Sequence, residues 1–284
     1  MIDADIKVIS KSMLPNYVDD FLRSFPDELW YCGNINLLQK PIITIVGTRK
    51  PSSYGIQLVS HLTERLSLYD IATVSGLAFG IDTLVHEQSI LNEIPTIAIP
   101  GSGLGKSVLY PRGNIEMAEK ILKHHGLLLS PFPIDRRAEK YFFPVRNCLM
   151  AAISNVVIVI EAQERSGSLI TAHHALEYGK PTYVFPGSYF SPLSRGCHQL
   201  INEGACVLSS FEDFVSDLGF PLKKSENTKS VTNMTLDIFD APKTLTELCE
   251  YFYLQPTDML VQLTLMEFEG KIINMGGRYQ KSRQ

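Results

Sequence analysis

Short runs of Ile, Val and Thr recur along the first two thirds of the chain, and each ends near a Gly, Ser or Pro. The runs occupy residues 42–46, 71–74, 96–99, 156–160 and 182–185, with a further candidate at 206–208. Their hydrophobic residues are nearly continuous instead of alternating with polar ones. Both faces of each strand are therefore expected to be buried, as in a parallel sheet covered by helices.

Helical patterns separate these predicted strands. Helices are expected over about 53–69, over about 114–126 with Asn114 as a favourable N-cap, and over roughly 168–178. Strand and helix thus alternate along the chain. The pattern predicts an α/β fold with a doubly wound, mostly parallel Rossmann-like sheet over residues 41–220.

The flanking segments have a different character. Residues 1–40 are interpreted as a helical lead-in, and the polar stretch 221–235 as a linker. Within 236–284, two apolar helical patterns are followed by a hairpin with a Gly-Gly turn. This order is typical of a small winged helix. Its second helix carries Asp258, Glu267 and Glu269, so we expect this domain to contact protein instead of a DNA groove.

Composition narrows the class of protein. Of the 284 residues, 45% are hydrophobic and 20% are charged, as in ordinary soluble proteins. The net charge is −4, so any anionic partner must be held by a local patch. The five cysteines form no CxxC pair, which argues against a zinc site or a disulfide framework. With no signal peptide and no apolar stretch of about 20 residues, a cytoplasmic protein without a membrane span is expected.

Three loops follow predicted strands and are candidates for holding phosphate. In an open α/β sheet, ligands bind at the carboxyl ends of strands, where helix N-termini present free N–H groups. The candidate residues are Gly47, Thr48 and Arg49 in the first loop, Ser75 and Gly76 in the second, and Ser166, Gly167 and Ser168 in the third. Ordinary helix capping or tight helix–strand packing would explain each loop alone. Together they favour a phosphate-bearing ligand.

Two nucleotide motifs are absent. Residues 100–107 resemble a P-loop, but Pro100 stands where the motif needs Gly, and Pro111 interrupts the helix that should follow. No GxGxxG follows the first strand either. Neither ATP hydrolysis nor a dinucleotide cofactor is expected, and no other cofactor is indicated.

A basic and aromatic segment lies further along the chain. Its cations are Arg136, Arg137, Lys140 and Arg146, and its rings are Tyr141, Phe142 and Phe143. Cations that follow a phosphate backbone, beside rings on which bases stack, are what sequence-tolerant binding of single strands requires. The alternative is that a Phe is core and the arginines coat the surface. Both can hold if neighbouring rings point in opposite directions.

Several motifs stand together in an order that resembles the DNA-processing protein A (DprA, also called Smf) family. They lie at residues 45–55, 74–82, 143–147, 161–172 and 200–205. The resemblance covers about 26–210, with a C-terminal segment similar to that family's winged helix. It implies a non-enzymatic, usually dimeric protein that binds single-stranded DNA. Such a protein protects incoming DNA and helps load the RecA recombinase in natural transformation and recombination.

The resemblance also implies roles for individual residues. Arg49 falls on the family's phosphate-binding arginine, and Lys140 and Phe143 fall on its basic and base-contacting positions. Arg146 and Asn147 match its Arg-Asn pair. The loops that begin at residues 75 and 166 line the same pocket in the family.

Three positions depart from the family pattern. Phe79 and Cys148 stand where the family usually has Arg, and Pro131 stands where it usually has Glu. The loss of two positive charges implies weaker phosphate binding or a shifted path of the strand.

Two other functions remain open. One is an enzyme acting on mononucleotides, because nucleotide phosphoribohydrolases share this general sheet. They carry a PGGxGTxxE motif, whereas residues 161–172 here lack its double glycine and its glutamate. The other is an adaptor that binds only protein.

Overall fold

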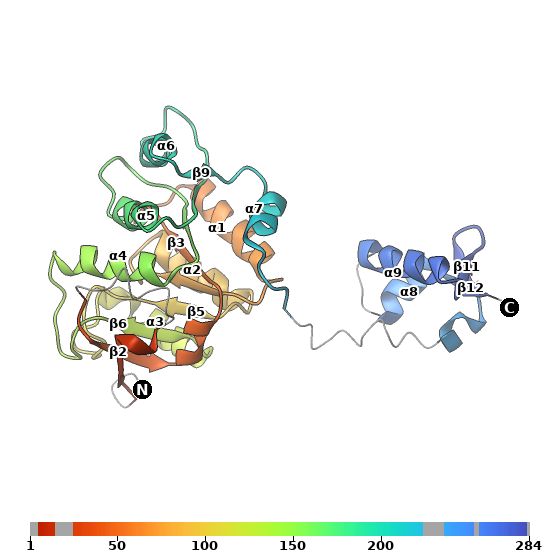
Figure 1. The fold of residues 1–284 in the computed structure, drawn as a ribbon, viewed down its shortest axis with the longest axis horizontal. Helices are drawn as coiled ribbons and strands as arrows, with labels where there is room; N and C mark the ends of the chain where they lie inside the picture. The colour runs from red at the N-terminus through yellow and green to blue at the C-terminus, as the bar shows by residue number, and fades with distance from the viewer. Residues whose placement is uncertain (1–4, 15–24, 224–235, 253–255, 283–284) are drawn as a thin grey trace. The chain divides into compact units, whose positions relative to one another are not determined.

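A computed structural model describes residues 5–14, 25–223, 236–252 and 256–282. The chain divides into two compact units, residues 1–223 and 224–284 (Figure 1). Within the described residues, no helix has the combined length and apolar character that a membrane span requires.

A nine-stranded sheet forms the centre of the first unit. Its strands are β1 (Lys7–Ser10), β2 (Glu28–Gly33), β3 (Ile42–Val46), β4 (Ala72–Ser75), β5 (Thr96–Ala98), β6 (Leu127–Ser130), β7 (Val156–Val159), β8 (Thr182–Val184) and β9 (Cys206–Val207). Their order in the sheet is β1-β2-β6-β5-β4-β3-β7-β8-β9. All pairs from β6 to β9 in this order are parallel, whereas β1 pairs antiparallel with β2, and β2 with β6. The predicted mostly parallel α/β fold is confirmed.

Helices cover both faces of the sheet (Figure 1). One face carries α1 (Ser53–Leu66), α2 (Ile81–Leu91), α3 (Ile115–Lys123) and α7 (Phe211–Leu218), and the other carries α4 (Phe142–Ile153), α5 (Ser168–Glu177) and α6 (Arg195–Asn202). Strand β3 shows why its apolar run is continuous. Ile43 and Ile45 join the core beneath α1, whereas Ile42 and Val46 join the core beneath α4 and α5. Each face of the strand therefore needs its own apolar side chains.

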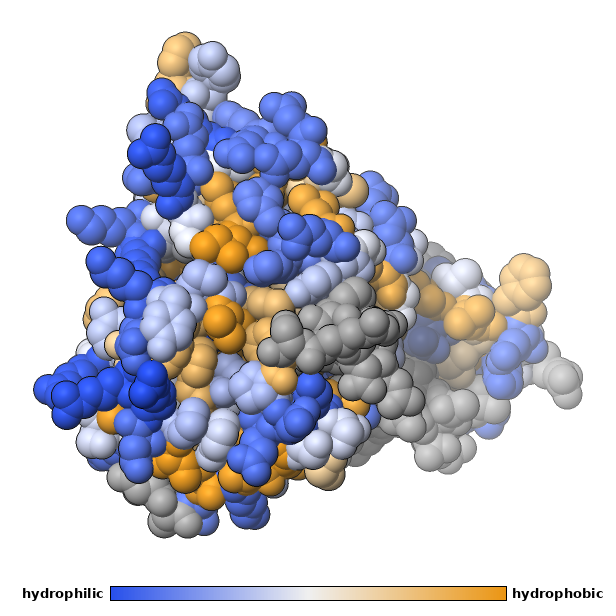
Figure 2. Space-filling model, turned by 60° about the vertical axis from the view of Figure 1, so that its left-hand side comes forward, coloured by the Kyte–Doolittle hydropathy of each residue, from blue (hydrophilic) through white to orange (hydrophobic). Residues whose placement is uncertain are grey.

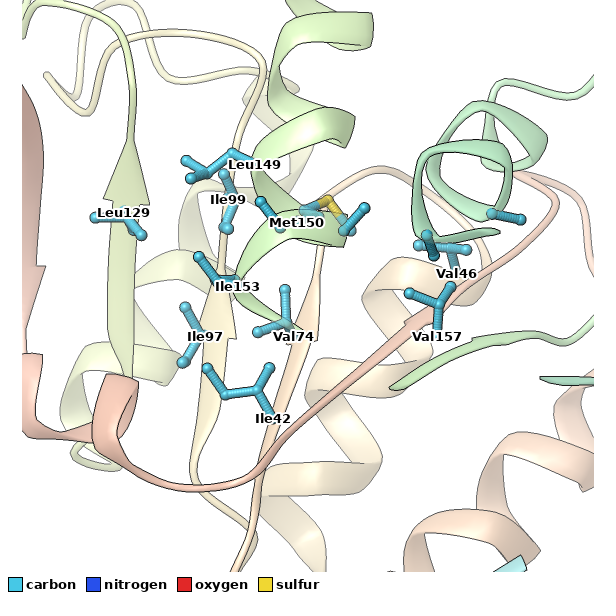
Figure 3. Close-up of a cluster of buried hydrophobic side chains, with 14 of the residues drawn as sticks. Ile42, Val46, Val74, Ile97, Ile99, Leu129, Leu149, Met150, Ile153 and Val157 are labelled. Atoms are coloured by element: carbon cyan, nitrogen blue, oxygen red, sulfur yellow. The ribbon is translucent and has the colours of Figure 1, made fainter. Parts of the chain in front are cut away.

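Helix α4 is held firmly on the sheet. Figure 3 shows Leu149, Met150 and Ile153 of α4 beside Val74 and Ile97 of the central strands. All five side chains are at most 1% exposed. This packing fixes the first turns of α4, which carry the candidate residues 143–147, above the carboxyl ends of the strands.

The expected helical lead-in over residues 1–40 is wrong. Among its described residues, 5–14 and 25–40, the chain forms strands β1 and β2 and two short 3-10 turns, η2 (Lys11–Met13) and η4 (Ile35–Gln39). Strand β2 is buried at only two of its six positions, so it lacks the continuous apolar run of the central strands. It also pairs with β6, whose Leu-rich sequence was not expected to be a strand.

The second unit is small and has its own core. It comprises η7 (Leu236–Asp240), β10 (Lys243–Thr244), α8 (Leu245–Phe252), α9 (Pro256–Phe268), β11 (Ile272–Asn274) and β12 (Arg278–Lys281). Its three strands pair in the order β10-β12-β11. Phe239, Leu248, Leu263, Ile272 and Tyr279 form the core. The two predicted helices and the hairpin are thus present.

The predicted linker, 221–235, lies mostly outside the described residues. Its first three residues belong to the first unit, because the Pro221 carbonyl accepts a hydrogen bond from Asp70 N and Lys223 N donates to the Leu68 carbonyl. Leu222 forms a β-bridge with Tyr69.

Candidate nucleic-acid interface

The sheet has one topological switch point. From β3 the chain moves through β4 and β5 to β6, and it then returns to add β7 on the other side of β3. The loops after β3 and β7 therefore leave the sheet in opposite directions and open a crevice, which is where open α/β sheets bind ligands.

A cavity of about 270 Å³ occupies this crevice. We call it the switch-point cavity. Its walls include Gly47 and Arg49 after β3, Asp82 on α2, Phe143, Arg146 and Asn147 on α4, and Ser166, Gly167, Ser168 and Thr171 at the start of α5. Residues more than 100 positions apart in the sequence thus meet at one site. Most of the candidate residues identified from the sequence are among them.

Arg49 and Phe143 both line this cavity and contact each other. The Arg49 guanidinium carbon lies 5.9 Å from the centroid of the Phe143 ring, within the range of a cation–π contact. Arg49 is exposed, and no carboxylate in the described part of the chain pairs with it. Phe143 is half-buried. A free cation beside a partly exposed ring can hold a phosphate and the adjoining base.

Arg146 has a different role, because it is only 5% exposed. Its Nη1 donates to the carbonyls of Gly76 and Ile99, and its Nε donates to Asn147 Oδ1 at 2.9 Å. Burial lowers the pKa of Arg146 to about 10, so it is still a cation at neutral pH. It ties α4 to the ends of β4 and β5 and brings a buried positive charge to the cavity.

Two like charges meet at the cavity. The charge of Arg49 contributes to the lowered pKa of Arg146, after the larger effect of burial. Asp82 opposes this effect, but its carboxylate already accepts hydrogen bonds from Gly76 N at 3.1 Å and Ala78 N at 3.4 Å. Burial raises the pKa of Asp82, while Arg146 lowers it. An anion bound beside Arg49 would relieve the remaining repulsion.

The start of α5 is open. The α5 N-cap residue, Gly167, makes no capping bond through a side chain, and a Cβ atom there would meet nothing within 4 Å. Asn147 Nδ2 donates to the Gly167 carbonyl at 3.0 Å and so positions this turn. The Ser166 and Ser168 hydroxyls lie 2.7 Å apart. Ser168 N donates to Ser166 Oγ at 3.4 Å and Leu169 N donates to the Ser166 carbonyl, whereas Gly167 N has no hydrogen bond within the described residues. This N–H group and the helix dipole favour an anion at such a place.

Thr171 adds a donor that the sequence did not reveal. Its side chain is 1% exposed and lines the cavity, and its Oγ1 has no hydrogen-bond partner among the described residues. Buried hydroxyls usually find a partner. The unused hydroxyl is consistent with a polar ligand in the cavity.

The start of α1, in contrast, is already occupied. The buried carboxylate of Glu161 accepts hydrogen bonds from Ser52 N at 2.9 Å and Ser52 Oγ at 2.6 Å. A phosphate therefore has no place at this helix end. Gly47 is needed for packing, because a Cβ atom there would lie 2.7 Å from Ile81 Cγ1. It also lines the switch-point cavity, and the interpretation of Gly47 as room for an anion stays a prediction.

Three other candidate residues lie behind the surface. The buried Ser75 hydroxyl donates to the Ile45 carbonyl at 2.7 Å, and the N–H and carbonyl of Gly76 are engaged by Asp82 and Arg146. Thr48 is 8% exposed, and its Oγ1 accepts a hydrogen bond from Lys50 N. These residues support the loops and expose little to a ligand.

Lys140 lies in a neighbouring cavity of about 360 Å³, which we call the basic groove. Its walls include Tyr110 and Arg112 after β5, Arg137 and Lys140 before α4, and Phe143. Because Phe143 lines both cavities, the three residues Arg49, Phe143 and Lys140 lie along one side of the first unit. Tyr110 and Arg112 were not identified from the sequence, although an aromatic residue near an arginine in a loop after a strand is a usable signal.

Of the three residues that depart from the family pattern, Phe79 lies beside Arg49 and Phe143, whereas Cys148 and Pro131 line none of these cavities. Phe79 is half exposed and borders a small hollow that Arg49, Tyr110 and Phe143 also line, so an apolar ring stands where the resemblance leads us to expect an arginine. Cys148 is elsewhere, with its Sγ 2.7 Å from the Tyr178 hydroxyl. Pro131 is buried. The Phe79 replacement is the one that changes the wall of the interface.

On the face shown in Figure 2, hydrophobic residues lie in separate patches among hydrophilic ones.

The chain is similar to proteins of known family over most of the first unit. The family model described as DNA recombination-mediator protein A matches residues 6–219. The DNA processing protein DprA of Bacillus subtilis is 42% identical over 194 residues, which are 68% of this chain and 64% of that protein. For DprA of Streptococcus pneumoniae the identity is 40% over 195 residues, 69% of this chain and 68% of that protein. The chain thus spans about two thirds of the length of these curated relatives.

Solved structures agree. DprA from Streptococcus pneumoniae superposes with a TM-score of 0.69 and 35% identity over 75% of each chain. A structure of DprA from Helicobacter pylori, which concerns its single-stranded DNA binding mode, gives a TM-score of 0.67 and 30% identity over 77% of this chain and 98% of that one. The resemblance seen in the motifs is confirmed. The chain belongs to the DprA/Smf family, the DNA recombination-mediator protein A family.

Proposed function

We propose that this protein binds single-stranded DNA along the switch-point cavity and the basic groove. One observation carries the proposal: the unpaired Arg49 cation, the Phe143 ring and the start of α5, which no carboxylate caps, line one cavity at the switch point of the sheet. Such a set can hold a phosphate and a base without reading the base edges.

Each part of the site has a task in this proposal. A backbone phosphate lies between Arg49 and the N-terminus of α5, where Thr171 Oγ1 donates a further hydrogen bond. An adjoining base stacks on Phe143, which contributes roughly 1–3 kcal/mol. Lys140 meets a later phosphate in the groove. Because phosphate contacts dominate, affinity falls as salt rises.

The role proposed for the whole protein is that of a recombination mediator. It protects incoming single-stranded DNA and helps load a RecA-type recombinase in natural transformation or recombination. The family's description as recombination mediators supports this role. A homodimer, which the family resemblance implies, and a cytoplasmic location, which the sequence composition favours, are parts of the proposal.

The proposal also gives the second unit a fold and a role. Two helices followed by a β-hairpin support a winged helix. Helix α9 contains no Lys or Arg, so it lacks the cations with which a recognition helix holds DNA. A protein-binding role suits this unit better.

A hydrolase acting on mononucleotides is less well supported. Among the residues that line the switch-point cavity, Asp82 is the one carboxylate, and backbone N–H groups already engage it. A general acid or base must instead reach the substrate. We therefore propose that binding, without catalysis, is the function.

The test is the affinity for a fluorescein-labelled oligothymidine, measured by anisotropy over a range of salt concentrations. Arg49→Ala is expected to weaken binding at least about tenfold and to flatten the salt dependence. Lys123→Ala is the matched control, because Lys123 is an exposed cation at the end of α3, shortly before β6 begins, and it lines neither cavity. Equal affinities for wild type and Arg49→Ala, or release of free base from mononucleotides, would refute the proposal.

A further inference from the structure

The basic groove holds more positive charge than the family resemblance assigned to it. Arg112, Arg137 and Lys140 all line it, and all three are exposed. No carboxylate in the described part of the chain forms an ion pair with any of them. Three uncompensated cations therefore gather in one hollow of a protein whose net charge is −4.

The single acid in the wall of the groove does not cancel this charge. Glu139 forms an ion pair with Arg136 at 2.9 Å. Arg136 itself lies over the Phe142 ring, 5.4 Å from its centroid, and donates to the Tyr141 hydroxyl. The Glu139–Arg136 pair is thus nearly neutral, and Arg137 stays free beside it.

The cations stand on two separate segments. Arg112 is in the loop that follows β5, whereas Arg137 and Lys140 are in the loop that precedes α4. They face one hollow of about 360 Å³ from both segments. A polyanion lying in the hollow would meet charge on both sides, which a single surface stripe would not provide.

Aromatic rings border the passage between the two cavities. The Tyr110 and Phe143 rings meet edge to face, with centroids 5.9 Å apart and an interplanar angle of 70°. Tyr110 is 42% exposed and lines the groove, and Phe143 lines both the groove and the switch-point cavity. A strand that passes from one cavity to the other crosses these rings.

We propose that the basic groove is a second phosphate subsite, in which Arg112 and Arg137 hold the single strand after it has crossed Phe143 and Tyr110. This inference rests on the proposed function and adds the path of the strand. Short oligomers occupy the switch-point cavity alone, and longer ones reach Arg112 and Arg137. The groove then contributes affinity only above a threshold length.

The test separates the two subsites by length. Salt dependence is measured for oligothymidines of about four and about twelve residues, a range typical of single-strand sites. When a side chain no longer neutralises one phosphate of a single strand, the slope of log affinity against log salt falls by about 0.7. Arg112→Ala and Arg137→Ala are each expected to reduce the slope by about that amount for the long oligomer and to leave the short one unchanged. The Lys123→Ala control should leave both slopes unchanged.

A second variant tests the path. Tyr110→Leu is expected to weaken binding of the long oligomer without changing its salt slope, because a ring and not a charge is removed. Slopes equal to wild type for Arg112→Ala and Arg137→Ala would overturn the second subsite. If Arg49→Ala still weakens binding at least about tenfold in that case, the proposed function stands and only the path is wrong. If wild type binds neither oligomer, both fail.

Discussion

The Ser52 hydroxyl donates a 2.6 Å hydrogen bond to Glu161 at the start of α1. The carboxylate comes from the end of β7, more than 100 residues away, and it fills the place where many Rossmann-like proteins hold a phosphate. The equivalent place at the start of α5 holds no such carboxylate. The protein thus closes one helix end of the switch point with its own acid and leaves the other open.

Replacing Glu161 by Ala should destabilise the first unit. The carboxylate is 4% exposed and accepts bonds from both the backbone and the hydroxyl of Ser52. We expect the free energy of unfolding to fall by about 1–3 kcal/mol, because buried donors lose their acceptor. Urea denaturation measures this change. Glu164→Ala is the control, since its exposed carboxylate should change stability by less than about 0.5 kcal/mol. An unchanged midpoint for Glu161→Ala would contradict the capping role.

Gly101→Ala should move the Phe143 ring. A Cβ atom at position 101 would lie 2.7 Å from two carbons of that ring. The displaced ring stacks less well on a base, so affinity for oligothymidine is expected to fall about tenfold, within the roughly 1–3 kcal/mol of one stacked base. Anisotropy gives the affinity. In a Phe143→Ala background the same substitution should have no further effect, and an additive loss would argue for a different cause.

Thr171→Val removes a hydroxyl and keeps the shape of the side chain. Because Thr171 Oγ1 has no partner in the described structure, the free energy of unfolding should stay equal or rise by up to about 1 kcal/mol. Affinity for single-stranded DNA should fall about five- to tenfold if the hydroxyl meets a phosphate. Paired measurements of stability and affinity decide the matter. A loss of stability with full affinity would mean that the hydroxyl serves the fold.

His86 should make the first unit sensitive to acid. The ring is fully buried, its Nδ1 lies 2.8 Å from Thr96 Oγ1, and burial lowers its pKa to about 3, with a smaller effect from Arg146. In the unfolded chain the pKa is about 6.5. Below about pH 6.5, His86 binds a proton in the unfolded chain but not in the folded protein. The stability that neutral His86 contributes to the fold is therefore complete above about pH 6.5 and declines as pH falls towards 3.

The expected slope is up to about 1.4 kcal/mol for each pH unit below 6.5. Urea denaturation at a series of pH values, with wild type and His86→Gln side by side, isolates the contribution. The variant is expected to be less stable at neutral pH, and its deficit should shrink as pH falls. A constant deficit from pH 7.5 to 5 would show that His86 does not titrate with folding.

The repeated runs of Val and Ile determined the α/β class and the central parallel strands. Residues 42–46 show why. All five positions of this strand are buried, so both sets of alternating side chains need to fit an apolar core. The resulting run of apolar residues can be recognised from the sequence of that strand alone. The edge strands gave no such signal. Strand β2 is only partly buried, and β6 is a run of Leu that favours a helix equally well.

The residue types of the candidate site were also readable, because loops that contain Gly, Ser or Arg follow three of the predicted strands. Which of them are free was decided by the tertiary structure alone. Arg49 and Arg146 look alike in the sequence, yet Arg49 is exposed, whereas Arg146 is buried and donates hydrogen bonds to two carbonyls that directly follow β4 and β5. The same holds for the two helix starts, one closed by Glu161 and one open. The type of a residue determines which hydrogen bonds and ion pairs its side chain can form. Groups brought close from distant parts of the chain determine whether those interactions are already made within the protein.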